Sequence, residues 1–162
     1  MLKQLDSFLS EETKTTWIMR AFGFFKIPLL FATSPQVISI DEYHCKIKMP
    51  FRKIIKNHLG SVYFGALSIG ADACIDMLAT HKIMKSKKKI NLIFKGFHAE
   101  FLKRAEGPVI FVCTEGRLIG QMIDEALTTG ERVNQSIKAT AYVHDEAVAE
   151  FELILSLKQQ KS

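Results

Sequence analysis

The stretch of sequence that decides the fold runs from Asn57 to Thr80 and reads NHLGSVYFGALSIGADACIDMLAT. It opens on a cluster of turn-forming residues, Asn57 to Ser61, and then continues to Thr80 without a proline. The helix that this composition predicts is apolar on nearly every side. A helix that is hydrophobic all round has to be buried, so we expect it at the centre of the molecule.

The few polar residues of this helix form one stripe, because Ser68, Asp72, Asp76 and Thr80 follow one another at i, i+4 spacing. A carboxylate in apolar surroundings must be paired, hydrogen-bonded or neutralised, and desolvation raises its pKa toward the range of a general base or acid. Asp72, in the middle of the helix, is the sharpest candidate for that role. We expect Asp76, one turn nearer the helix end, to be solvated. Such a stripe is equally typical of a helix face that meets a second subunit or water.

Ahead of the central helix, the sequence predicts an amphipathic helix and then two strands. Ser10 is a typical N-cap, and apolar residues follow at helical spacing until Pro28 ends the helix; they are Trp17, Ile18, Ala21, Phe22 and Phe25. From Pro35 the apolar residues alternate with polar ones, which predicts a hairpin whose turn lies around Asp41 and Glu42.

After the central helix, the stretch from His81 to Lys89 is rich in lysine, and we expect it to be a solvated loop. Residues 90–105 predict one long strand that is bent or bulged near Gly96. Residues 109–114 predict a second strand, which we expect to pair with the first across the turn at 106–108.

The remaining chain predicts a short helix and a final hairpin. Apolar residues at helical spacing over 118–127 end at Gly130, a typical C-cap. Alternation over 133–143 and 149–157 predicts two strands joined by a turn at 144–146.

This order of elements predicts an α+β fold, because a single apolar helix in an antiparallel protein can be covered only by a curved sheet. A curved antiparallel sheet wrapped around a long central helix is the hotdog arrangement. We therefore expect one domain over residues 1–162, with a hotdog core at 35–158 and an N-terminal helical extension at 1–34.

Composition agrees with one globular domain. The chain has 162 residues, of which 48% are hydrophobic and 24% charged, and a domain of this size needs neither disulfides nor a structural metal. A net charge of +5 suits an anionic ligand. The lysines are not accompanied by an RNA- or DNA-binding motif, so no nucleic-acid partner is expected.

The cysteines and the N-terminus favour a cytoplasmic protein. Cys45, Cys74 and Cys113 are far apart, lack zinc-ligand spacing and have apolar neighbours, so we expect buried thiols in a reducing compartment. Residues 1–10 lack the layout of a secretory signal. The apolar stretches 22–32 and 62–79 are interrupted by lysine and proline or by aspartates, so membrane insertion is not expected.

Residues Asn57 to Asp72 resemble the hotdog-fold acyl-CoA thioesterases of the PaaI-like type. The signature of that group is Asn-x-x-Gly-x-x-His-Gly-Gly, four variable residues and then Leu-Ala-Asp, and the residues that match it without a gap are Asn57, Gly60, Gly65, Ala71 and Asp72. Tyr63 stands at the position of the His and Phe64 at that of the first Gly. This substitution resembles a less characterised hotdog branch with an aromatic-Gly signature. The stretch 101–105 is similar to the Phe-Leu-Arg-Pro-Ala stretch of the family.

The resemblance implies hydrolysis of a medium- or long-chain acyl thioester without a metal or redox cofactor. Asp72 would act as general base on a water or, as an alternative, as nucleophile, the Gly65 amide would hold the oxyanion, and Asn57 would position the water or the carbonyl. The helix N-terminus favours negative charge at that amide. For Asn57 and Gly60, shaping the turn and capping the helix is an equal alternative.

The residues expected to bind substrate lie around this motif and on a later strand; they are His58, Gly60, Tyr63, Phe64, Ser68, Lys103 and Arg104. Phe94, Phe97 and Phe101 are further candidates for the acyl tunnel, with core packing as the alternative. The lysines at 85–89, with Lys103 and Arg104, are candidates for the coenzyme A phosphates. The carrier is coenzyme A or an acyl carrier protein.

The resemblance also implies an obligate homodimer or a tetramer, because the site in this fold is shared between two facing helices. One rival function is a non-catalytic acyl-binding or regulatory protein, motivated by Tyr63 and Phe64. A third is a hotdog dehydratase, since His58 precedes Asp72 by the spacing of a catalytic His and acid in those enzymes. The proline-containing loop of the dehydratases is absent from residues 59–64.

Overall fold

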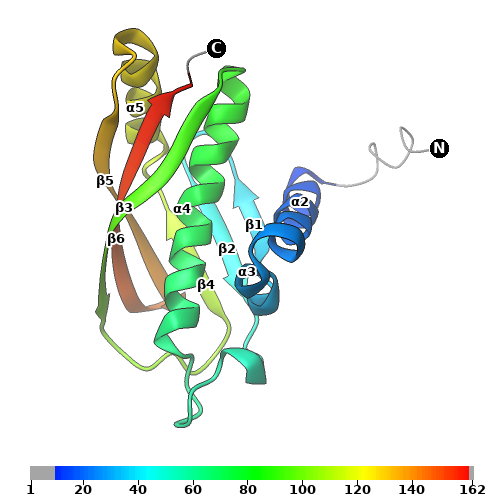
Figure 1. Cartoon of the computed structure of the whole chain (residues 1–162). Coiled ribbons are helices and arrows are strands. Elements are labelled where there is room, and N and C mark those ends of the chain that lie inside the picture. The colour runs from blue at the N-terminus through cyan, green and yellow to red at the C-terminus, as the bar shows by residue number, and fades with distance from the viewer. Residues whose placement is uncertain (1–9, 161–162) are drawn as a thin grey trace, which may run out of the picture.

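Six antiparallel strands form one curved sheet around a long central helix in the computed structural model, which describes residues 10–160 (Figure 1). The elements in chain order are α2 (Glu11–Lys26), α3 (Pro28–Thr33), β1 (Gln36–Ile40), β2 (Cys45–Met49), the 3-10 turn η1 (Lys53–Ile55), α4 (Phe64–Ser86), β3 (Ile90–Phe101), β4 (Val109–Cys113), α5 (Gly116–Thr129), β5 (Val133–Val143) and β6 (Glu146–Gln159). The predictions for residues 1–9 and 161–162, including the one about a secretory signal, lie outside the described residues.

The strand order is β1-β2-β4-β5-β6-β3, so β3 lies at one edge of the sheet. The expected pairing of β3 with β4 is wrong, because β3 pairs with β6 while β4 lies between β2 and β5. The connection between them does not turn back. It passes the start of α4, where the Val62 N–H donates to the Ala105 carbonyl at 2.8 Å, and thus crosses to the middle of the sheet.

Helix α4 is the predicted central helix, and its sheet-facing side is buried throughout. The Phe111 ring of β4 packs directly on the backbone at Gly70, where an added Cβ would lie 2.2 Å from ring carbons. The expected loop at 81–89 is only partly correct. Helix α4 continues to Ser86 and ends with Lys87 in a left-handed conformation, because no proline or glycine interrupts this lysine-rich stretch and lysine is a good helix former.

The N-terminal helices pack beside α4 at the β1 edge of the sheet (Figure 1). Ser10 caps α2 by accepting from the Thr13 N–H, and α2 ends two residues before Pro28, which begins α3. The apolar face predicted for α2 is not the buried one. Trp17 and Phe25 are 64% and 76% exposed, because α2 packs through Met19 and Gly23.

The other local predictions are confirmed. Strands β1 and β2 form the hairpin around Asp41, whose carboxylate accepts from the two backbone N–H groups that follow the turn. The register of β3 shifts between Phe94 and Gly96, as expected of a bulge. Strands β5 and β6 form the final hairpin, and its turn has positive φ at His144 and Asp145.

The three cysteines are buried and free, as predicted. Each lies where the sheet meets the central helix: Cys45 and Cys113 are paired across β2 and β4, and the Cys74 thiol donates to the Cys45 carbonyl at 3.3 Å. Among the described residues, no helix is both long and apolar enough to cross a membrane.

Candidate functional site

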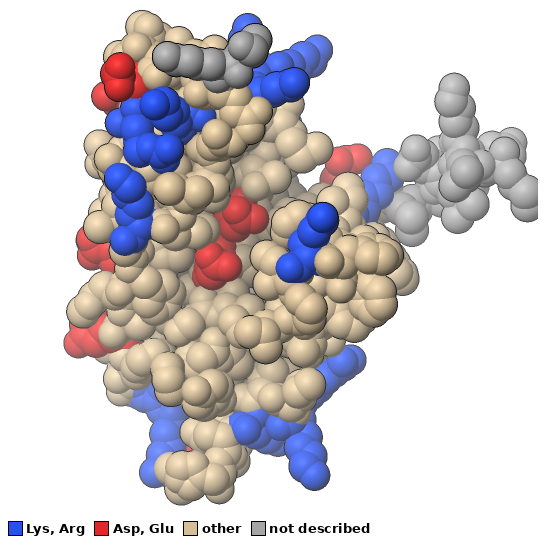
Figure 2. All heavy atoms as spheres, in the orientation of Figure 1, with Lys and Arg blue, Asp and Glu red and all other residues tan. Residues whose placement is uncertain are grey.

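A cavity of about 750 Å³ lies between α4, the N-terminal helices and the first half of β3. Figure 2 shows it as a hollow in which acidic side chains lie among residues other than Lys, Arg, Asp and Glu. The α4 residues that line it are Asp72, Ala73, Asp76, Met77, Thr80, His81, Met84 and Lys85. The opposite wall consists of α2 and α3 residues, and Leu92, Ile93 and Phe94 of β3 complete the lining.

Asp72 and Asp76 are half-buried in the wall of this cavity. Neither carboxylate has a hydrogen-bond or ion-pair partner in the described part of the chain. Burial raises the pKa of Asp72, and burial together with the Asp72 carboxylate raises the pKa of Asp76 from 3.8 to about 6. The expectation that Asp76 is solvated is therefore wrong. The N-terminal helices cover the half of α4 on which it lies.

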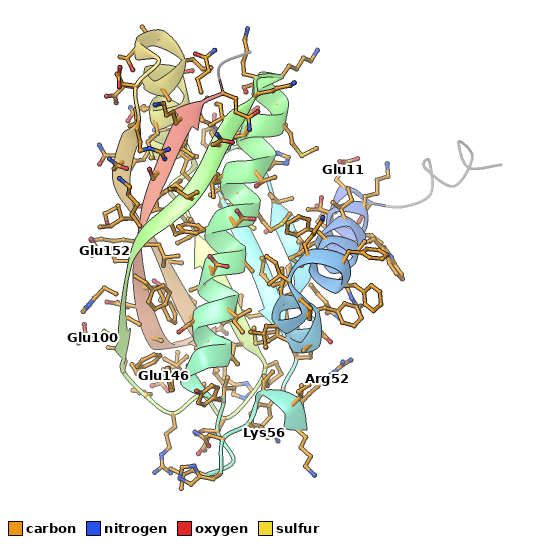
Figure 3. All side chains as sticks on the ribbon, in the orientation of Figure 1. Glu11, Arg52, Lys56, Glu100, Glu146 and Glu152 are labelled. Atoms are coloured by element: carbon orange, nitrogen blue, oxygen red, sulfur yellow. The ribbon has the colours of Figure 1, made fainter. Side chains whose placement is uncertain are left out.

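Charged groups gather at the end of the cavity that lies near the C-terminus of α4. Glu11, labelled in Figure 3 at the first turn of α2, and Lys14 line it from one side and Lys85 from the other. Lys85 is also 3.4 Å from the Glu42 carboxylate. The Nε2 atom of His81 is buried without a hydrogen-bond partner among residues 10–160, and burial lowers the pKa of this imidazole.

A second cavity, of about 590 Å³, lies at the other end of α4. Six of the predicted site residues line it, namely Asn57, His58, Tyr63, Phe64, Lys103 and Arg104. Phe101 also lines it, whereas Phe94 lines the first cavity. Gly60, Gly65 and Ser68 line neither cavity. The predicted site is thus divided, with Asp72 in one cavity and most substrate-binding candidates in the other.

The side chain of Asn57 holds its own turn together. Its Oδ1 accepts from the backbone N–H groups of Leu59 and Ser61, and its Nδ2 donates to the Ser61 hydroxyl at 3.0 Å. Gly60 has φ +81°, a left-handed conformation that favours glycine. In this structure both residues therefore shape the turn, which is the alternative that the sequence left open.

Tyr63 and Gly65 are in direct contact at the start of α4. An added Cβ on Gly65 would lie 2.4 Å from Cε1 of the Tyr63 ring, so the ring occupies the space that this glycine leaves. The ring centroids of Tyr63 and Phe64 are 4.6 Å apart, and those of Phe64 and Phe101 are 6.2 Å apart. The Gly65 N–H belongs to the first turn of α4, where amides have no acceptor within the helix.

The remaining residues predicted to bind substrate are hydrogen-bonded or ion-paired elsewhere, or are exposed. The Ser68 hydroxyl donates to the Phe64 carbonyl at 3.0 Å. Lys103 pairs with Glu146, and Arg104 is exposed. The lysines at 85–89 follow the C-terminal half of α4, whereas Lys103 and Arg104 lie beside its N-terminus. With a rise of 1.5 Å per residue, α4 is roughly 35 Å long. The two basic groups of one chain therefore cannot form a single phosphate site.

The distances along α4 also separate the catalytic candidates. Gly65 and Asp72 are seven residues apart, which places them on the same helix face but roughly 10 Å apart along the axis. His58 and Asp72 lie in different cavities, so a single chain does not bring the dehydratase pair together.

Reasoning from sequence missed three contributors to the first cavity: Asp76, His81 and the apolar residues of the N-terminal helices. A signal existed for Asp76, which continues the stripe of Asp72 by one helical turn. For α2, the apolar spacing predicted a buried face, whereas Ile18 and Phe22 of that face line the cavity and remain exposed.

The family model described as "Domain of unknown function (DUF4442)" matches residues 15–155. No curated protein matches the sequence. Several solved structures are similar. A Pseudomonas aeruginosa protein of unknown function, described as a probable thioesterase, has a TM-score of 0.74 at 22% identity, covering 90% of this chain and 96% of its own.

Two further structures are similar over nearly their whole length. A protein of unknown function from Chlorobaculum tepidum has a TM-score of 0.79 at 12% identity, covering 92% of this chain and 97% of its own. A mutant thioesterase from Pseudomonas aeruginosa has a TM-score of 0.68 at 12% identity, covering 93% of this chain and 96% of its own. These likenesses, together with the sheet wrapped around α4, show that the fold is a hotdog, as the sequence predicted.

Proposed function

Because the chain belongs to the DUF4442 family and has the hotdog fold of proteins described as thioesterases, we propose that it hydrolyses an acyl thioester. The substrate is an acyl-CoA with a medium or long acyl chain. The observation that supports this proposal is the carboxylate of Asp72, which has no partner in the described residues and lies on the wall of a largely apolar cavity. Such a group is typical of a general base or acid.

Asp72 acts as general base in the proposed reaction. It takes a proton from a water molecule, whose oxygen attacks the thioester carbonyl and forms the new carbon–oxygen bond. The tetrahedral intermediate then expels the thiolate as the carbon–sulfur bond breaks, and the proton passes from Asp72 to the sulfur. The products are a carboxylic acid, ionised at neutral pH, and a thiol, and neither an oxidant nor a metal is required for this balance.

The oxyanion requires a donor close to the carbonyl, and in one chain the Gly65 amide lies too far from Asp72 to serve. A reacting carbonyl has to be roughly 3 Å from both groups, whereas their separation along α4 is roughly 10 Å. We therefore propose a homodimer in which Asp72 faces Gly65 of the partner subunit. Strand β3 is an edge strand with exposed Ile93, Phe97 and Phe101, which suits pairing with a second copy. Two such dimers would give a tetramer.

The carrier end of the substrate is assigned to the second cavity. Lys103 and Arg104 border it, and their charges suit the phosphates of coenzyme A or of the phosphopantetheine on an acyl carrier protein. Three buried free thiols are consistent with a reducing cytoplasm.

The test is thiol release from acyl-CoAs of increasing chain length by the wild-type protein and by Asp72→Asn. General-base catalysis contributes typically 10² to 10⁴ in rate, so we expect the variant to lose about 100-fold or more in kcat. Asp124→Asn, on the exposed face of α5, is the matched control and should retain full activity. Full turnover by Asp72→Asn would remove Asp72 from the mechanism, and a monomer in sedimentation would contradict the shared site.

A second candidate is a protein that binds acyl-CoA without cleaving it. Two observations favour it: the Tyr63 ring covers Gly65, and the Asn57 side chain is engaged in its turn. This function predicts that acyl-CoA raises the melting temperature while no thiol is released.

A further inference from the structure

We propose that the N-terminal helices α2 and α3 form the binding wall for the acyl chain, and that Ile18 and Phe22 of α2 contact the chain along its path. The acyl chain would lie in the first cavity, from Asp72 toward the C-terminal end of α4. This inference rests on the proposed function, since it identifies the acyl chain as the occupant of the cavity in which Asp72 lies.

The shape of the cavity suits a long, narrow ligand. Its α4 lining extends from Asp72 to Lys85, which corresponds to roughly 20 Å along the helix axis. Ile18, Phe22 and Leu30 form the facing wall, and Leu92 and Phe94 of β3 complete the lining. The volume of about 750 Å³ lies within the range of roughly 300 to 1,000 Å³ found for small-molecule sites.

Large apolar side chains among the lining residues are exposed rather than packed against protein. Ile18 is 62% exposed and Phe22 51% exposed, although both line the cavity, and Met84 of α4, on the other side, is also exposed. Covering apolar surface is favourable in proportion to its area. An apolar occupant would therefore be stabilised along the apolar part of the groove, between Asp72 and the charged end.

The two carboxylates favour an occupant whose part inside the cavity is uncharged. A protein surface seated in the groove would bury Asp72 and Asp76 without partners, which is costly. A free fatty acid would bring a third carboxylate next to them. A thioester carbonyl carries no charge, so an acyl thioester can place its reactive carbon at Asp72 and its alkyl chain along α2. The ionised product would then be repelled by the same carboxylates, which assists its release.

Hydrophobic transfer gives the expected size of the effect. Each buried methylene contributes about 0.8 kcal/mol, which corresponds to about fourfold in affinity. Affinity should therefore increase about fourfold per methylene up to the length of the cavity and stay constant for longer chains.

The test uses S-alkyl-CoA thioethers, which cannot be hydrolysed, with octyl and hexadecyl chains, and isothermal titration of the full chain. Phe22→Ala should weaken binding of both probes about tenfold, because Phe22 lies toward the Asp72 end of the cavity, which both alkyl chains occupy. Phe22→Trp should narrow the groove near Asp72 and weaken binding of both probes. Phe24→Ala and Phe24→Trp are the matched controls, because Phe24 lies on the same helix, is exposed and does not line the cavity.

Binding is measured separately from hydrolysis, so failure of the proposed acyl-binding wall can be distinguished from failure of the proposed thioesterase activity. Chain-length-dependent binding that changes with Phe22 but not with Phe24 supports the inference even if no thioester is cleaved. Three results would overturn it: no thioether binding, equal effects of the Phe22 and Phe24 variants, or a change of oligomeric state in the Phe22 variants. The last result would show that a second copy of the chain occupies the groove. Hydrolysis that is unchanged in the Phe22 variants at every chain length would support the proposed enzyme and refute the proposed wall for the acyl chain.

Discussion

Replacement of Asp76 by asparagine should stabilise the protein above pH 6 and remove much of its pH dependence. Burial and the neighbouring Asp72 carboxylate raise the pKa of Asp76 from 3.8 to about 6, so the folded state holds this proton more tightly than the unfolded chain does. Below pH 3.8 both states are protonated. As the pH rises from 4 to 6 the unfolded chain releases its proton first, and the free energy of unfolding falls.

The size of the effect follows from the two pKa values. Their difference corresponds to about 3 kcal/mol. The free energy of unfolding of the wild-type protein is lower by this amount above pH 6 than at pH 4. Asp72, whose pKa is also raised by burial, contributes in the same direction. The other charged or titratable groups lining the cavity are Glu11 and Lys14 of α2 and His81 and Lys85 of α4. The lining residues of β3 carry no charge.

The assay is urea unfolding followed by far-ultraviolet circular dichroism at pH 4, 5, 6 and 7. With a slope of about 2 kcal/mol/M, 3 kcal/mol moves the midpoint by about 1.5 M. We expect the midpoint of Asp76→Asn to exceed that of the wild type by about this amount at pH 7 and to approach it at pH 4. Asp124→Asn, which changes an exposed carboxylate, is the matched control. If both variants follow the wild type at every pH, the carboxylate of Asp76 is solvated and does not destabilise the folded protein.

Three further predictions concern packing and reactivity. Gly70→Ala should lower the free energy of unfolding by about 1 to 3 kcal/mol, because its Cβ would lie 2.2 Å from the fully buried ring of Phe111. Gly65→Ala should lower the free energy of unfolding by less than about 1 kcal/mol, since the half-exposed Tyr63 ring can rotate away. Equal losses of stability in the two glycine variants would contradict this difference. The thiol of Cys113, whose pKa burial raises to about 12, should resist a thiol reagent at pH 8 in the folded protein and react after unfolding in urea.

Much of the fold could be predicted from the sequence because local patterns carry it. The all-round apolar character of residues 62–80 required a buried helix, and alternation with turn residues at 144–146 required a hairpin. The incorrect predictions concern relations between elements. Strands β3 and β4 are consecutive in the chain but not in the sheet, and no local pattern distinguishes a hairpin from a crossover when the connection is seven residues long.

The site shows the same limit. The i, i+4 stripe identified Asp72 correctly as a carboxylate in apolar surroundings, and the family motif placed Gly65 at the start of the same helix. The stripe could not show which element would cover it, because an amphipathic helix such as α2 can pack against any apolar surface within reach of its connection. That cover determines the chemistry. If α2 were absent, Asp72 and Asp76 would face water and keep ordinary acidity. With α2 in place they line an apolar groove in which a carboxylate can accept a proton near neutral pH. The N-terminal helices therefore belong to the proposed site as much as the motif does, and removing their apolar wall should alter both the acidity of the carboxylates and the choice of acyl chain.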